Sequence, residues 1–166
     1  MKLRDALSTE IELIRKQRIN AYSDHEQSVP SDHWNALKRA ISTDVDNQKG
    51  VDLIVADLDG EIVGSVVLFP ANTDAYEGNL EELEYPEIRM LAVAPNARGK
   101  AVASSLVDEC IRRAKEKGYR AIGLHTGQFM KNAIKLYERL GFKRLPEYNF
   151  EPANDGIMVL AYRLTF

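Results

Sequence analysis

Cysteine is almost missing from this chain of 166 residues, which contains Cys110 alone. A single cysteine excludes an internal disulfide framework and a thiolate metal cluster. Cys110 shares a helical face with Leu106 and Ala114, and this spacing favours a buried apolar thiol over a nucleophile. His25 and His33 have no metal-like spacing to paired carboxylates, so we expect no metal.

Long apolar runs are also missing, since no stretch approaches the roughly 18 residues that a membrane span needs. The first residues include Asp5, Thr9 and Glu10 and lack the apolar block of a secretory signal. We therefore expect a soluble, cytoplasmic protein without a membrane partner. Hydrophobic residues make up 45% of the chain, enough for one core, which predicts a single domain over residues 1–166.

Positive charge is absent from residues 50–88, which hold ten acids and no Lys or Arg. Residues 89–148 reverse this, with thirteen Lys and Arg against five acids. The two charged halves fit either separate polyanionic and cationic ligands or simply solvated surfaces. A nucleic-acid partner is not expected, because the net charge is −3 and the basic residues are not interleaved with aromatics.

Hydrophobic periodicity predicts an α/β (α+β) chain, a mixed sheet with helices on its faces. Thr9 and Glu12 form a capping-box pattern at the first helix start, and Asp59-Gly60 suits a hairpin turn. The predicted helices cover residues 9–22, 31–41, 98–117 and 129–140, and the predicted strands cover 2–5, 52–57, 61–69, 87–94, 120–125, 142–145 and 157–164. The acidic connection 70–86 is long enough to suggest a functional loop.

A loop with small residues separates the strand at 87–94 from the helix that follows. Backbone N–H groups at the start of that helix lack helical partners, and the helix dipole adds positive potential there. Gly99 and Ala101 leave room for an anion, and Arg98 and Lys100 add charge. The alternative is that small residues only let the helix pack close to the sheet. The Walker pattern is absent, so nucleotide triphosphate hydrolysis has no support.

Two segments, EIRMLAVAPNARGKAVASSL and NAIKLYERLGF, resemble the GCN5-related N-acetyltransferase (GNAT) family of acetyl-coenzyme A dependent enzymes. The first is similar to that family's pyrophosphate motif (Q/R)xxGx(G/A), with Asn96, Gly99 and Ala101 at its defined positions. Asn96 departs from Gln or Arg, which alters one side-chain contact but leaves the backbone cradle. The resemblance implies a mostly antiparallel central sheet, acceptor-side helices in residues 1–50, and an acetyl-coenzyme A core over residues 87–145.

The resemblance also assigns roles to individual residues. Tyr137 would protonate the departing coenzyme A sulfur, and its alternative role is a packed helix-face aromatic. The backbone near Leu91 would polarise the thioester carbonyl. Asn132 would bind the pantetheine arm, or else cap its helix. The implied cofactor-binding residues are Leu91, Ala92, Val93, Arg98, Gly99, Lys100, Ala101, Val102, Ala103 and Asn132.

The base that removes the acceptor's proton has three candidates. Glu87 comes first, because strand alternation places it on one face with Arg89, Leu91 and Val93. A strand-edge charge paired with Arg89 is its structural alternative. His125 is the second candidate, at the end of a neighbouring strand. A relay of water is the third.

The predicted activity is direct transfer of an acetyl group from acetyl-coenzyme A to a primary amine in a ternary complex. Acidic residues 74–87 favour a small cationic acceptor such as a polyamine, an aminoglycoside-like amine or a lysine-like amine. A protein N-terminus or an amino-acid derivative is equally compatible. The alternatives are a non-catalytic acyl-coenzyme A sensor and an unrelated phosphate-binding protein. Both a monomer and a homodimer fit the sequence.

Overall fold

A computed structural model describes residues 1–72 and 83–166 and contains one seven-stranded sheet in the order β1-β2-β3-β4-β5-β7-β6. Its pairs are antiparallel except for β4 and β5, which run parallel. The strands are β1 (Lys2–Asp5), β2 (Asp52–Leu58), β3 (Glu61–Phe69), β4 (Glu87–Val93), β5 (Ala121–Gly127), β6 (Lys143–Arg144) and β7 (Val159–Thr165). The mixed, mostly antiparallel sheet that the sequence predicts is confirmed.

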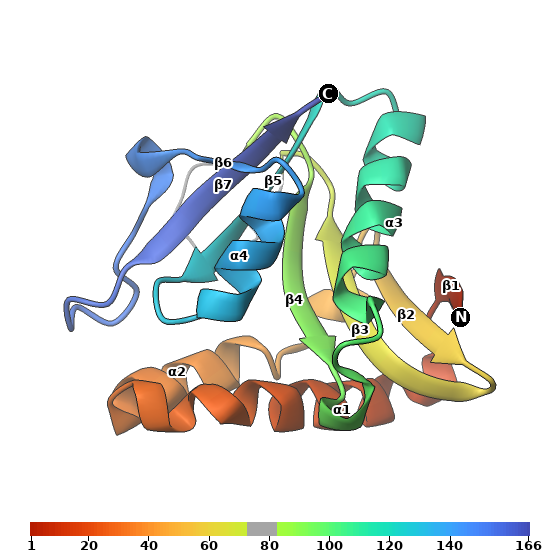
Figure 1. Cartoon of the computed structure of the whole chain (residues 1–166), viewed down its shortest axis with the longest axis horizontal. Helices are drawn as coiled ribbons and strands as arrows, with labels where there is room; N and C mark the ends of the chain where they lie inside the picture. Colours follow the sequence, from red (N-terminus) through yellow and green to blue (C-terminus); the bar gives the residue numbers. More distant parts are fainter. Residues whose placement is uncertain (73–82) are drawn as a thin grey trace.

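Four α-helices cover the two faces of the sheet (Figure 1). They are α1 (Ile11–Tyr22), α2 (Ser31–Ala40), α3 (Val102–Glu116) and α4 (Lys131–Arg139). A core cluster around Ile14, Val55, Val67 and Phe69 lies under α1 and α2. A larger cluster lies between the opposite face and α3 and α4. The helices therefore form two layers with the sheet between them.

The start of α1 differs from the predicted Thr9–Glu12 capping box. A short 3-10 helix, η1 (Ser8–Glu10), precedes α1, and the Glu10 carboxylate accepts a hydrogen bond of 2.7 Å from the Leu7 backbone N–H. Arg4 holds the same carboxylate at 2.8 Å. These bonds lower the pKa of Glu10 to about 2, the Arg4 contact first and the Leu7 N–H second. Glu10 thus takes the capping role that the pattern assigned to Glu12.

The predicted hairpin between β2 and β3 is confirmed. Asp59 and Gly60 both have positive φ, 54° and 88°, as a two-residue turn of this kind requires. The Asp57 carboxylate accepts a 2.8 Å bond from the Gly60 N–H and closes the turn. The acidic connection at 70–86, in contrast, falls largely on residues outside those that the structure describes.

A bulge in β4 changes which side chains face the two helical layers. Between the pairs Ser65–Ala92 and Val67–Arg89 the register shifts, so β4 holds one residue more than β3. Met90, at this point, has φ of 60°. Arg89 and Met90 consequently both face the α1 and α2 layer, and Leu91 packs against the opposite cluster. The prediction that Glu87, Arg89, Leu91 and Val93 share a face is wrong, because the bulge interrupts the alternation after Arg89.

Strands β4 and β5 diverge soon after they begin. Among the described residues their pairing consists of Glu87 with Gly123 and Ile88 with Leu124. Beyond Ile88 the two strands separate, and the opening faces the start of α3 and the body of α4 (Figure 1). The remaining part of β4 therefore has a strand partner, β3, along one edge only.

Cys110 is fully buried among apolar residues, and burial raises the pKa of its thiol well above the usual range. The expected apolar role of Cys110 is confirmed. Among the described residues no helix has the length and apolar character needed to cross a membrane.

Candidate active site

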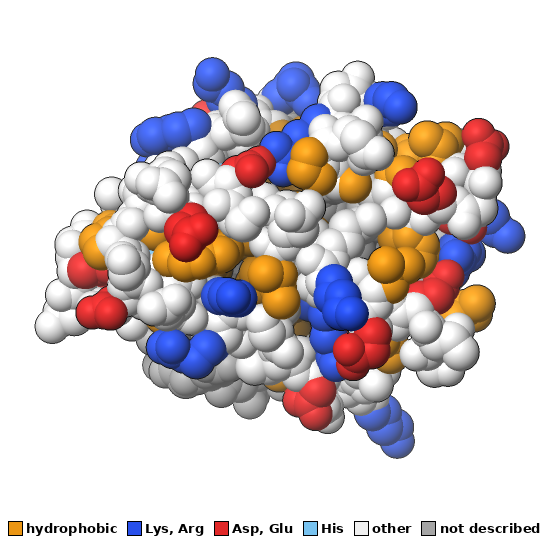
Figure 2. Space-filling view, turned by 90° about the horizontal axis from the view of Figure 1, so that it is seen from below, with side chains coloured by type: hydrophobic (Ala, Val, Ile, Leu, Met, Phe, Trp, Pro, Cys, Tyr) orange, Lys and Arg blue, Asp and Glu red, His pale blue; other side chains and the backbone are white. Residues whose placement is uncertain are grey.

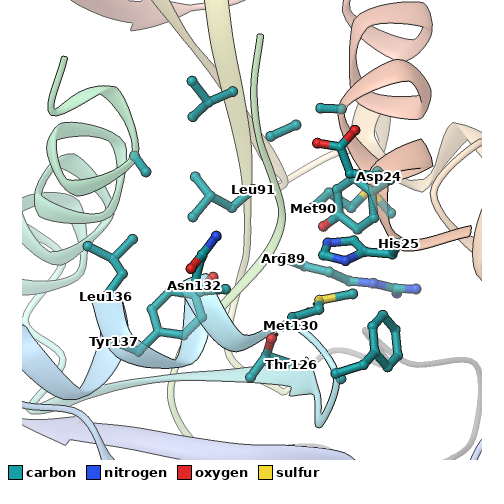
Figure 3. A pocket seen from close by; sticks show the side chains of 18 of the residues that line it. Asp24, His25, Arg89, Met90, Leu91, Thr126, Met130, Asn132, Leu136 and Tyr137 are labelled. Atoms are coloured by element: carbon teal, nitrogen blue, oxygen red, sulfur yellow. Dashed lines mark hydrogen bonds between the residues drawn. The ribbon is translucent and has the colours of Figure 1, made fainter. Parts of the chain in front are cut away.

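A cavity of about 950 Å³ occupies the space where β4 and β5 separate. Its wall includes β4 from Ile88 to Val93, the end of β5, the loop into α3 and one side of α4. The opposite end is closed by α1, α2 and the segment between them. Figure 3 shows side chains from these separate elements converging on one space. A cavity of this size can hold an extended ligand and a second small molecule.

The loop into α3 carries an unusual row of unpaired donors. The backbone N–H groups of residues 99–104 donate to no group of the described chain, and the first helical bond runs from the Ser105 N–H to the Ala101 carbonyl at 3.1 Å. Gly99 and Ala101 adopt left-handed backbone conformations with φ of 79° and 61°. The helix itself begins at Val102, four residues later than the sequence predicts. These donors, with the helix dipole, suit a phosphate or pyrophosphate.

Close packing does not explain the glycine in this loop. A Cβ at Gly99 would meet nothing within 4 Å, so its lack of a side chain leaves space on the solvent side. The close approach of α3 to the sheet depends instead on Gly64, where a Cβ would lie 2.9 Å from Val102 Cγ1. The open space beside Gly99 suits an anion, as do the unpaired N–H groups of residues 99–104, which we call the cradle.

The two charged residues of this loop, Arg98 and Lys100, differ in whether they line the cavity. Arg98 lines the cavity and forms an ion pair with Asp24, and its second nitrogen lies 3.4 Å from the Ala21 carbonyl. It thereby ties the loop to the end of α1. Lys100 is exposed and does not belong to the cavity wall, whereas Val102 and Ala103 do.

Helix α4 presents both residues that the second motif predicts. Asn132 and Tyr137 lie on the side of α4 that faces Leu91, with Asn132 at the exposed end (Figure 3). The helix cap is Met130, and no side-chain bond caps the helix, so Asn132 has no capping role. Tyr137 is 5% exposed, packs against Phe142 and Tyr162, and lines the cavity. Burial raises the pKa of its hydroxyl, which keeps it protonated at neutral pH.

The strand backbone predicted to contact the cofactor lies along the cavity. Leu91, Ala92 and Val93 are all in its wall. Ala92 is buried toward α1, while Leu91 and Val93 pack toward α3 and α4. All three belong to the part of β4 that does not pair with β5.

The two candidate bases form a pair beneath the cavity. Glu87 is 4% exposed and lies outside the wall, and its Oε2 is 3.5 Å from His125 Nδ1. His125 Nε2 is 3.1 Å from the Tyr148 carbonyl oxygen. A carbonyl only accepts, so Nε2 carries the proton of this bond. His125 itself lines the cavity, and Glu87 is therefore one side chain removed from a bound acceptor.

Several wall residues were not expected from the sequence. His25 and His33, considered there only as metal ligands, both pack edge-on against Phe129, with ring centres 5.4 Å and 5.6 Å apart. Arg89 lines the same end of the cavity. No local pattern links these residues, because His25 and His33 lie 64 and 56 positions before Arg89 and Phe129 lies 40 positions after it. Among the described residues, no group of three or more His, Cys, Asp or Glu side chains could hold a metal ion.

Known proteins are similar to this chain in both sequence and fold. An uncharacterised N-acetyltransferase of Methanocaldococcus jannaschii is 36% identical over 50% of this chain and 37% of its own length. An uncharacterised N-acetyltransferase of Escherichia coli is 32% identical over 60% of this chain and 55% of its own length. This chain thus matches about half, or less, of each relative.

Solved structures share the fold over nearly the whole chain. The PaiA N-acetyltransferase of Thermoplasma acidophilum, determined in complex with coenzyme A, has a TM-score of 0.72, with 14% identity over 99% of this chain and 98% of its own. A histone acetyltransferase HPA2-related protein of Corynebacterium glutamicum has a TM-score of 0.70, with 22% identity over 98% and 94%. The sequence profile of the acetyltransferase (GNAT) family matches residues 11–142, and the chain belongs to that family.

Proposed function

We propose that this chain transfers an acetyl group from acetyl-coenzyme A to a primary amine by direct attack in a ternary complex. The observation that carries the proposal is the cavity, which joins the cradle at 99–104 to Tyr137 and then to a separate end under α1 and α2. One end suits a phosphate-bearing co-substrate and the other a small acceptor. The family assignment supplies the reaction class.

Binding of the co-substrate rests on the backbone. The unpaired N–H groups of residues 99–104 and the open space at Gly99 fit the pyrophosphate of coenzyme A. Leu91, Ala92 and Val93 offer the unpaired edge of β4 to the pantetheine amides, and Asn132 faces it from α4. A backbone N–H near Leu91 then donates to the thioester oxygen as negative charge develops there. Acetyl-coenzyme A supplies an activated acyl group with a thiolate leaving group.

Tyr137 acts as the proton donor to the departing sulfur. Its hydroxyl is neutral because burial raises its pKa, and it lies on the face of α4 that lines the cavity. Both ring nitrogens of His125 face other groups, Nε2 the Tyr148 carbonyl and Nδ1 the Glu87 carboxylate, so His125 does not take the proton from the acceptor directly. The proton passes through water to the Glu87–His125 pair. A single bridging water commonly connects two polar groups that do not touch.

The acceptor is a small amine, cationic at its reacting end before it loses a proton. The argument for a polyamine rests on acidic residues 74–87, most of which lie outside the described residues. A non-catalytic sensor of acyl-coenzyme A is the second candidate, favoured by the depth at which Tyr137 and Glu87 are buried. A cytoplasmic location and the oligomeric state stay predictions from the sequence.

The test measures release of the coenzyme A thiol across an amine panel, beside calorimetric binding of acetyl-coenzyme A. Tyr137→Phe is expected to lower kcat by about 10²- to 10⁴-fold, the usual contribution of a general acid, with nearly unchanged acetyl-coenzyme A binding. Tyr119→Phe, outside the cavity wall, is the matched control. Binding of acetyl-coenzyme A without thiol release on any amine would favour the sensor. If the wild-type protein does not bind acetyl-coenzyme A, the anion-binding role of residues 99–104 is wrong.

A further inference from the structure

Basic residues line the cavity from several elements. In the described wall they outnumber acidic ones, since Asp24 is the single carboxylate there and it pairs with Arg98. Lys131, Lys135 and Arg139 line it from α4. Arg89 lines it from β4, on the face toward the α1–α2 layer.

Arg89 points into the acceptor end of the cavity. It pairs with Val67 across the sheet, before the extra residue of the bulge, and shares the face of β4 that packs under α1 and α2. Arg89 extends beneath His25 and beside Met130 (Figure 3). The guanidinium carbon lies 6.0 Å from the centre of the Phe69 ring, which supports one side of it. Leu91 follows Arg89 by two residues, across the bulge at Met90, and also lines the cavity.

A row of rings lines the same end of the cavity as Arg89. Tyr22, His25, Phe129 and His33 make edge-to-face contacts in sequence, with centres 6.2, 5.4 and 5.6 Å apart. All four line the cavity. His33 is fixed by a 2.8 Å bond between its Nδ1 and Asp155. Burial lowers the pKa of His25, so this part of the wall carries no charge from His25 at neutral pH.

We propose that the acceptor is an α-amino acid with a free carboxylate and a large apolar or aromatic side chain. Arg89 binds the carboxylate, the ring row receives the side chain, and the amino group reaches the acyl carbon near Leu91. The bond that forms joins the amine nitrogen to the acetyl carbon, and the bond that breaks is the thioester C–S bond. The ammonium nitrogen loses two protons: one leaves through water before attack, and the second leaves as the amide forms and restores the Tyr137 hydroxyl, whose own proton goes to the sulfur. This inference rests on the proposed acetyl transfer.

The reach of an α-amino acid matches this arrangement. Its carboxylate and amine are separated by one carbon, so a residue that holds the carboxylate also fixes the position of the amine, and Arg89 and Leu91 line the same cavity. A guanidinium also suits a carboxylate better than an ammonium does, because two parallel hydrogen bonds fix its plane. A polyamine would bring a second positive charge toward Arg89 and would be repelled.

The experiment compares four acceptors in the thiol-release assay: phenylalanine, phenylalaninamide, alanine and spermidine. We expect phenylalanine to give the highest kcat/KM, although the amide loses its amine proton more readily. Arg89→Gln should raise KM for phenylalanine about 10- to 100-fold, the loss of a charged hydrogen-bonded contact, and leave KM for the amide nearly unchanged. Arg120→Gln, an exposed arginine outside the wall, should change neither.

Product binding provides a second readout that does not depend on turnover. Calorimetry on the coenzyme A-loaded protein should show N-acetylphenylalanine binding more tightly than its amide, with the difference abolished in Arg89→Gln. Equal use or binding of acid and amide, or preferred use of spermidine, would overturn the carboxylate assignment while acetyl transfer stands. If acetyl-coenzyme A binds but no amine causes thiol release, the proposed acetyl transfer itself is wrong.

Discussion

At the scale of single residues, the Glu87–His125 pair shows how burial changes the role of a side chain. Glu87 forms one of the two pairs between β4 and β5 in the described chain, and a Cβ on Gly123 would come within 2.5 Å of Tyr85 Cε2 and 2.7 Å of Glu87 Oε1. The absence of a side chain at Gly123 thus leaves room for both of these side chains. A carboxylate held there can accept a proton that arrives through water, but it cannot touch the acceptor itself.

This position predicts a pH-dependent effect of Glu87→Gln. Below the pKa of the acceptor amine, we expect kcat/KM to fall about 10²-fold or more, as when a general base is removed. At higher pH the loss should shrink, because the amine is already neutral and needs no base. A pH series of the thiol-release rate measures this. An equal loss at every pH would indicate that Glu87 only supports the strand.

At the scale of elements, periodicity and turn residues predicted most of the fold. Helices α3 and α4 end two residues before Gly118 and Gly141, the expected stops, and both glycines have the positive φ of a helix stop, 87° and 96°. The segment EIRMLAV contains no glycine to mark a bulge, so alternation gave the wrong face for Leu91 and Val93. The bulge becomes visible only in the register with β3.

Much of the candidate site could be predicted from the spacing of residues within the two motif segments. Residues of the cradle and of α4 lie in short segments whose spacing survives in the fold, so Gly99, Asn132 and Tyr137 come from the two motifs and also line one cavity. The acceptor end could not be found, because His25, Arg89 and Phe129 meet only through tertiary packing. His25 and Phe129 lie outside both motif segments, and Arg89, inside the first, is not one of its defined positions, so spacing along the chain does not predict that the three meet.

Met90 offers a test of the strain in this element. Its φ of 60° is unfavourable for a β-branched side chain, so Met90→Ile should lower the free energy of unfolding by about 1–3 kcal/mol more than Met90→Leu. Ile and Leu are isomers, and the comparison therefore isolates branching at Cβ. Urea unfolding of both variants provides the two free energies. Equal values would show that the bulge relaxes without cost.

At the scale of the whole molecule, ion pairs join parts that are distant along the chain. Asp52, from the acidic half, pairs with Arg113 and Lys117 of the basic half, at 3.1 and 3.3 Å. On the face covered by α1 and α2, acidic and basic side chains lie among one another (Figure 2). The opposite charges of the two sequence halves are therefore partly neutralised within the fold.

One buried group links α1 to the segment before β2. Asp46 is 1% exposed, within 2.7 Å of Arg15 and 2.9 Å of the fully buried Arg18. Burial alone would raise the pKa of Asp46, but the bonds and charges of Arg15 and Arg18 outweigh burial and lower it below 3.8. This contribution to stability is present above pH 3.8 and declines as the pH falls toward the folded-state pKa.

Asp46→Asn should therefore destabilise the protein most at neutral pH. We expect a loss of about 3–5 kcal/mol in the free energy of unfolding at pH 7, because Arg18 stays buried without its counter-ion. At pH 3 the difference from wild type should be smaller. Urea titrations at both pH values measure it, with exposed Asp108→Asn as control, expected within about 0.5 kcal/mol. A loss that does not depend on pH would mean that packing, not charge, explains it.

The short pairing of β4 with β5 has a consequence for the mechanics of the molecule. Strands β1 to β4 form one block and β5 to β7 another, and within the described chain two residue pairs hold the blocks together as one sheet. A ligand chain lying in the opening between β4 and β5 would form hydrogen bonds in place of the missing strand contacts. The bound co-substrate would then connect the two blocks, and the backbone amide hydrogens of β4 and β5 along the opening would exchange more slowly once it is bound.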